Sequence, residues 1–152
     1  MSIIYLIGRA AFVAIFLVSG IFNLMDREKA AALIQSKFTF PAGLANAVGR
    51  AEAATGLTGY QLLAIGVSVI EIVFALLIIF NVVTRFSAFV LFVFVAVATF
   101  YLYDFWDMAG DARSLAMTLA LQNLSIMGGL LILMVLGPWR PGGSFEDDDY
   151  TV

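Results

Sequence analysis

The chain has 152 residues, of which 62% are hydrophobic and only 12% charged, and its formal net charge is −3. Soluble domains are about 25% charged, so a chain with a mean hydropathy of +1.02 is expected in a lipid bilayer. Cys and His are both absent. Their absence excludes disulfides, thiolate metal sites, iron–sulfur clusters and the usual haem ligand. We therefore expect no metal and no catalytic residue, and the scattered Lys and Arg predict no nucleic-acid partner.

Four apolar stretches are long enough to cross a bilayer, which takes about 20 residues. They are residues 3–25, 59–80, 86–103 and 115–136. No basic residue precedes Ile3, so the first stretch is interpreted as a retained helix and not as a secretory signal. The predicted fold is all-α: a polytopic membrane protein whose four transmembrane helices form an antiparallel bundle within residues 1–140.

The long connection between the first two spans has two short helical patterns. Asp26–Lys37 carries apolar residues at helical spacing, and Pro41 follows its end. Leu44–Ala54, rich in Ala, is the second pattern. Two short helices lying in the membrane interface would suit this sequence, and so would a compact soluble hairpin.

Acidic residues outside the spans gather in two places. Residues 141–152 predict a flexible tail, and its acids form either a solvated end or a docking peptide for a basic partner. The acids before the fourth span are more typical of helix caps and solvated loops than of a cation site. The tail acids are Glu146, Asp147, Asp148 and Asp149, and the loop acids are Asp104, Asp107 and Asp111.

The distribution of basic residues predicts the orientation. An even number of spans places both termini on one side of the membrane. Cytoplasmic loops are enriched in Lys and Arg, and the side opposite the termini has more of them. We therefore expect a bacterial cytoplasmic membrane with periplasmic termini. The opposite side has Arg27, Lys29, Lys37, Arg50 and Arg113, and the terminal side has Arg85 and Arg140, with Arg9 near it.

Glu71 lies near the middle of the second span. An acid at that depth costs about 3 kcal/mol unless it is neutralised or paired. Arg9 lies in the first span, and when both are counted from the terminal side their depths differ by less than one helical turn. The sequence thus predicts an ion pair between Arg9 and Glu71. A pair would mean that Arg9→Gln restores much of the stability lost in Glu71→Gln.

Three further polar residues are predicted to join this pair. Asn23 shares a helical stripe with Arg9, Ser68 shares one with Glu71, and Asn123 lies on a similar stripe of the fourth span. Three interpretations stay open. The cluster fixes the packing of the helices, or it forms a pocket for a quinone headgroup or another small polar ligand, or it contacts lipid or a partner protein.

Four segments, one from each span, resemble the DoxX family of small membrane proteins and occur in the family's order. The resemblance implies a four-helix membrane bundle. It also implies roles such as a subunit of a quinone-reducing thiosulfate oxidoreductase or an accessory of oxidative-stress membrane complexes. The segments are GRAAFVAIFLVSGIFNLM (8–25), VIEIVFALLIIFNVVTR (69–85, with Glu71), TFYLYDFW (99–106) and QNLSIMGGLL (122–131).

The chain departs from the family pattern at three positions. Asn23, Tyr103 and Gln122 are neutral where members often have Lys, His and Lys. These departures, with the absence of His and Cys, favour a non-catalytic accessory subunit of a larger membrane oxidoreductase or energy-converting complex, with other membrane subunits as partners. The alternative is a quinone-binding subunit that uses a Glu71/Arg9 pocket. Quinone is the one cofactor that this alternative requires, and no cofactor motif is present.

Overall fold

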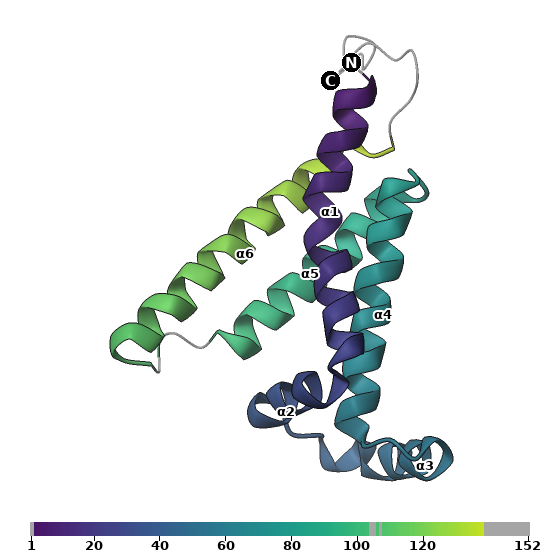
Figure 1. The fold of residues 1–152 in the computed structure, drawn as a ribbon, viewed down its shortest axis with the longest axis vertical. Coiled ribbons are helices and arrows are strands. Elements are labelled where there is room, and N and C mark those ends of the chain that lie inside the picture. The colour runs from purple at the N-terminus through teal and green to yellow at the C-terminus, as the bar shows by residue number, and fades with distance from the viewer. Residues whose placement is uncertain (1, 104–105, 107, 139–152) are drawn as a thin grey trace.

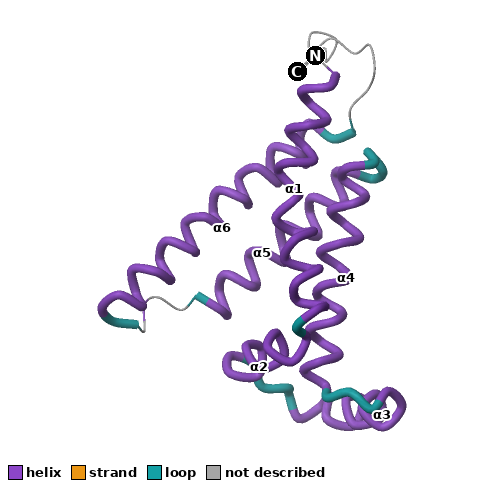
Figure 2. Tube along the Cα trace, viewed as in Figure 1, coloured by secondary structure: helices purple, strands orange, loops and turns teal. Residues whose placement is uncertain are grey.

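A computed structural model describes residues 2–103, 106 and 108–138, and every regular element in these ranges is a helix (Figures 1 and 2). The elements are α1 (Ser2–Met25), α2 (Arg27–Lys37), the 3-10 helix η1 (Ala42–Leu44), α3 (Ala45–Thr55), α4 (Gly59–Ile79), α5 (Thr84–Leu102) and α6 (Gly110–Leu136). Of these, α1, α4, α5 and α6 are long and apolar enough to cross a membrane. The predicted all-α fold with four membrane spans is confirmed. Residues 141–152, with Glu146, Asp147, Asp148 and Asp149, lie outside the described residues, as does Arg140.

Local sequence signals set most helix ends. The side chain of Asp26 accepts a hydrogen bond from the backbone of Lys29 and begins α2. Thr58 and Gln61 exchange side-chain and backbone hydrogen bonds in a capping box that begins α4. The start of α6 differs from the prediction, because this helix begins at Gly110 and not at residue 115. Asp111 therefore lies in the first turn, where the helix dipole favours an acid, and does not cap the helix.

The four long helices form two antiparallel pairs, α1 with α4 and α5 with α6. The pairs are joined mainly where α4 packs on α5. Figure 1 shows that they converge at the end where α1 begins and α6 ends, and diverge at the other end. We call these the terminal end and the loop end. At the loop end α2 and α3 lie across the α1–α4 pair, and α2 packs against α4.

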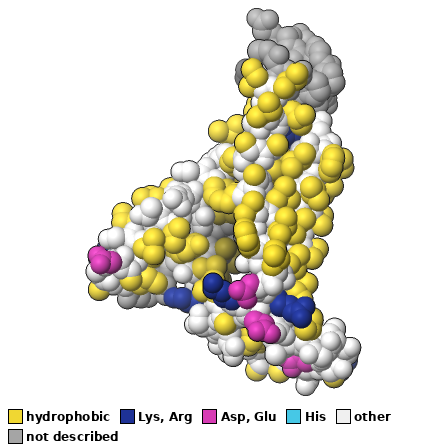
Figure 3. Space-filling model, in the orientation of Figure 1, with side chains coloured by type: hydrophobic (Ala, Val, Ile, Leu, Met, Phe, Trp, Pro, Cys, Tyr) yellow, Lys and Arg dark blue, Asp and Glu magenta, His cyan; other side chains and the backbone are white. Residues whose placement is uncertain are grey.

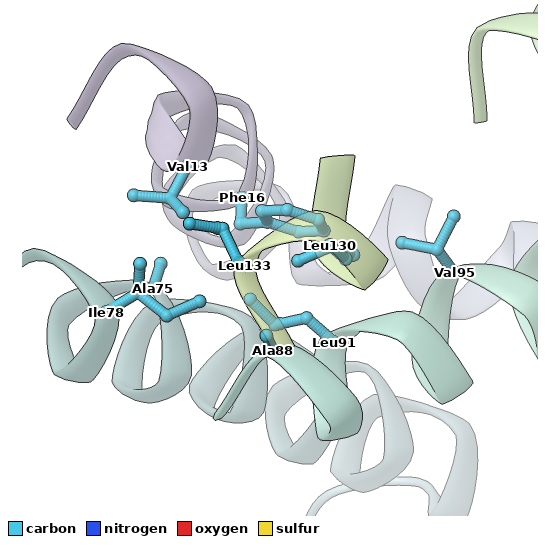
Figure 4. Packing of buried hydrophobic residues seen from close by; sticks show 9 residues of the cluster. All are labelled: Val13, Phe16, Ala75, Ile78, Ala88, Leu91, Val95, Leu130 and Leu133. Carbon is cyan, nitrogen blue, oxygen red and sulfur yellow. The ribbon is translucent and has the colours of Figure 1, made fainter. Parts of the chain in front are cut away.

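The hydrophobic core lies where the pairs converge. Every long helix contributes to it, and Figure 4 shows the side chains pointing toward one another. Close by, Phe12 of α1 covers Gly129 of α6 so tightly that a Cβ at Gly129 would overlap the Phe12 ring. The core residues are Val13, Phe16, Ala75, Ile78, Ala88, Leu91, Val95, Leu130 and Leu133.

Helices α1 and α4 approach each other closely at Gly20. A Cβ on Gly20 would lie 2.7 Å from Cγ1 of Ile72 and 3.0 Å from the carbonyl oxygen of Ser68. Small residues allow such approaches between membrane helices, where dispersion forces and not the hydrophobic effect hold the helices together. Gly20 therefore fixes which residues of α1 and α4 face each other.

Gly20→Ala is expected to lower the free energy of unfolding by about 1–3 kcal/mol, because the added methyl overpacks the α1–α4 contact. Gly66→Ala, on the same pair of helices, is the matched control: a Cβ there meets nothing within 4 Å. Thermal unfolding in mild detergent measures both. Equal melting temperatures for the two variants would contradict the role given to Gly20.

Candidate functional site

Arg9 is buried, with 4% of its surface exposed, and it binds the turn between α4 and α5. Its guanidinium donates hydrogen bonds to the carbonyl oxygen of Ile78, to Oδ1 of Asn81 and, at 2.8 Å, to Oγ1 of Thr84. The guanidinium carbon lies over the ring of Tyr5, 5.3 Å from the ring centre. One side chain of α1 thus ties the end of α4 to the beginning of α5.

This turn needs such support. Asn81 and Val83 both have positive φ, +62° and +41°, and a β-branched residue seldom adopts this conformation. The last carbonyl groups of a helix also lack intrahelical donors. Arg9 adds a donor to the carbonyl oxygen of Ile78, which also accepts from the backbone N–H of Asn81 at 3.1 Å. Arg85 provides a donor to α6, with Nη2 3.4 Å from the carbonyl oxygen of Val135. Arg9 and Arg85 therefore stabilise helix ends near the terminal end.

The predicted ion pair between Arg9 and Glu71 is wrong. Within the described residues no basic group pairs with Glu71, and Arg9 has the three partners named above. The reason is the register set by Gly20, because α1 extends past the end of α4 (Figure 1). Ser19, not Arg9, lies opposite Glu71. The ten residues from Arg9 to Ser19 correspond to about 15 Å of helix.

Glu71 is 4% exposed and has one hydrogen bond. Its Oε1 accepts a long hydrogen bond of 3.5 Å from Oγ of Ser19, which accepts one of 3.4 Å from Nδ2 of Asn23. Its Oε2 is buried and has no partner in the described part of the chain. Ser68 does not join this group, since its hydroxyl donates to the carbonyl oxygen of Ala64 in its own helix.

The helices line a cavity of about 580 Å³, open on one side, on the loop-end side of the core. Phe16 and Val95 belong to both the core and the cavity wall, so the cavity begins where the core ends. Most of the lining is apolar, and α2 contributes Leu33 and Ile34 to it. The polar side chains of the lining are Ser19, Asn23, Lys37, Glu71, Tyr101, Tyr103 and Asn123.

Asn123 lies on the wall formed by α5 and α6. Its Nδ2 donates a 2.9 Å hydrogen bond to Oγ1 of Thr99, whose hydroxyl donates to the carbonyl oxygen of Val95 at 2.6 Å. This hydrogen bond holds the amide in place. Asn123 lines the cavity from the α5–α6 pair, whereas Glu71 lines it from the α1–α4 pair. The cavity therefore has polar groups on two opposing walls.

The predicted cluster is divided in two. Glu71, Asn23 and Asn123 line the cavity, whereas Arg9 and Ser68 do not. Sequence reasoning missed Ser19 and Lys37. Ser19 and Asn23 are four residues apart on one helix face, a signal that could have identified Ser19.

A metal site receives no support from the described residues, which contain no group of three potential acidic, His or Cys ligands. Asp104 and Asp107 lie outside them.

The register predicts that Arg9→Gln and Glu71→Gln act independently. Sites far apart with no shared partners have additive effects, so the double variant should lose the sum of the two single losses. Arg9→Gln alone should cost at least about 2 kcal/mol, since hydrogen bonds to charged groups contribute about 1.5–3 kcal/mol each. Thermal unfolding of the four proteins in one detergent gives the cycle. A double variant that is more stable than Arg9→Gln would contradict this prediction and support the ion pair between Arg9 and Glu71.

Comparison with known proteins supports one family. Residues 4–104 match the family model described as DoxX, which covers α1 to α5 and more than half of the chain. No curated protein and no solved structure matches the chain. The match includes Arg9, Glu71 and most of the cavity lining, and it ends before α6. The chain therefore belongs to the DoxX family.

Proposed function

We propose that this chain is an accessory subunit of a membrane oxidoreductase complex and that it holds a quinone headgroup in the cavity between the two helix pairs. The observation that carries the proposal is Oε2 of Glu71, a buried carboxyl oxygen without a partner in the described residues. Buried polar groups are almost always hydrogen-bonded. A ligand in the cavity would supply the missing partner.

The lining suits a quinone in size and in chemistry. Small-molecule pockets have volumes of about 300–1,000 Å³, mostly apolar walls and a few polar groups that fix orientation. The cavity, at about 580 Å³, has this composition. A carboxyl group accepts a hydrogen bond from a quinol hydroxyl when it is ionised, and donates one to a quinone carbonyl when it is protonated. Asn23 and Asn123 offer amides to the same ring.

The composition of the chain supports the accessory role. Its sequence has no Cys and no His, the residues that most often hold iron–sulfur clusters and haem. A quinone held here would therefore exchange electrons with a centre on another subunit. The chain's own residues would bind and orient the ring.

Glu71→Gln is expected to raise the dissociation constant for decylubiquinone at least tenfold, which equals about 1.4 kcal/mol, because the variant loses the carboxyl group that bonds the ring. Quenching of Trp fluorescence in detergent measures the binding, and an ultraviolet spectrum of the organic extract shows whether quinone copurifies. Glu28→Gln is the matched control, since Glu28 is exposed on α2 and does not line the cavity. Equal affinities for the two variants, or no binding by the unaltered protein, would refute the quinone site.

We also propose that the membrane is a bacterial cytoplasmic membrane and that the loop end faces the cytoplasm. Arg27, Lys29, Lys37 and Arg50 lie at that end, in α2 and α3, and cytoplasmic loops carry such an excess. At the terminal end Arg9 and Arg85 donate hydrogen bonds to carbonyl oxygens at the ends of α4 and α6.

Cysteine labelling tests the orientation, because the chain has no native Cys. In intact cells an impermeant maleimide is expected to leave Ala53→Cys of α3 unlabelled and to label it after the cells are broken. Labelling of Ala53→Cys in intact cells would reverse the orientation.

A further inference from the structure

Three of the four sides around the cavity are closed by helix packing. The α1–α4, α4–α5 and α5–α6 contacts close them, and at the loop end α2 packs on α4 and α5. The remaining side lies between α1 and α6. Their contact near Phe12 and Gly129 is at the core, and no extensive packing joins these two helices elsewhere in the described residues. We call this side the α1–α6 gap.

Both sides of the gap carry apolar side chains. Ile15 of α1 and Ile126 of α6 line the cavity on its two sides, and Ile15 is 51% exposed. Both lie within segments that are long and apolar enough to cross a membrane. In Figure 3 the surface is hollowed where the α5–α6 arm faces α1 and α2. Such a gap would give a molecule dissolved in the lipid a route to the cavity that does not cross water.

The depth of Glu71 in the membrane limits which lipid-dissolved molecules can place a polar head against it. Twelve residues separate Gly59, where α4 begins, from Glu71, which corresponds to about 18 Å of helix. The hydrocarbon core of a bilayer is about 30 Å thick, so the carboxyl lies near its middle. A phospholipid keeps its charged headgroup at the surface, far from Glu71. A small uncharged head on a long hydrocarbon chain reaches that depth readily.

We infer that the cavity is loaded sideways from the bilayer through the α1–α6 gap, and that its occupant is a long-chain amphiphile with a small uncharged head. The head lies against Glu71, and the chain leaves through the gap into the lipid. This inference deepens the proposed quinone function and rests on it for the identity of the head. It excludes water-soluble ligands and phospholipids.

Spin labels on the two walls of the gap test the route. The full chain, which has no native Cys, is labelled as Ile15→Cys or Ile126→Cys and placed in phosphatidylcholine nanodiscs. Collisions of the nitroxide with oxygen, which dissolves in lipid, are compared with collisions with a water-soluble nickel chelate. Ile132→Cys, on an exposed face of α6 away from the cavity, is the lipid reference, and Ala53→Cys of α3 is the reference outside the spans.

Both gap labels are expected to resemble Ile132→Cys, with frequent oxygen and rare nickel collisions. Nickel collisions at the rate seen for Ala53→Cys would show a water-filled cavity, and few collisions of either kind would show a closed one. Each of these two results would overturn the sideways route. Two positions on opposite helices keep the test valid if one variant fails to fold.

A second measurement addresses the occupant. Adding a long-chain quinone to the nanodiscs is expected to lower oxygen collisions at least twofold at Ile15→Cys and Ile126→Cys, and to leave Ile132→Cys unchanged. Gap labels that are open to oxygen but unaffected by quinone would reject quinone as the head and leave the route intact, so the two failures are distinguishable. An equal drop in oxygen collisions at all three positions would come from quinone dissolved in the bilayer and would reject quinone as the occupant of the cavity.

Discussion

The contact of Gly20 with α4 determines which side chains of α1 and α4 face each other. It brings the backbones of α1 and α4 together, and in an antiparallel pair a single such contact fixes every other facing position. Arg9 therefore meets the α4–α5 turn, and Ser19 meets Glu71. This register gives Arg9 its acceptors at the α4–α5 turn and leaves Oε2 of Glu71 without a partner in the described residues.

The elements of the fold could be predicted from the sequence because each has a local cause. The four spans follow from the length of their apolar stretches, and α2 follows from helical spacing after Asp26. The interpretation of Arg9 and Glu71 failed because counting residues from a span's end assumes that all helices begin at one plane. Here α1 extends beyond α4, and no local pattern in the sequence reports that offset.

The candidate site was predictable only in part. Glu71, Asn23 and Asn123 were recognisable as polar residues at membrane depth, and they do line one cavity. The cavity itself arises from the divergence of the two helix pairs. That divergence depends on where the shared core stops, at Phe16 and Val95, and thus on packing among all four spans. Arg9 lies at the opposite end, where the pairs converge, and stabilises the turn between α4 and α5.

The Arg9 contact also constrains how the chain is made. Arg9 belongs to α1, which leaves the ribosome before α4 and α5, and its partner Asn81 follows 72 residues later. At about 5–20 residues per second, roughly 4–14 s of synthesis separate the two. During that time α1 holds a cation in or near the membrane without its native acceptors. Insertion of α4 and α5 ends this state, because the turn between them carries the acceptors of Arg9. The contacts of an early helix are thus completed by a turn that is synthesised later.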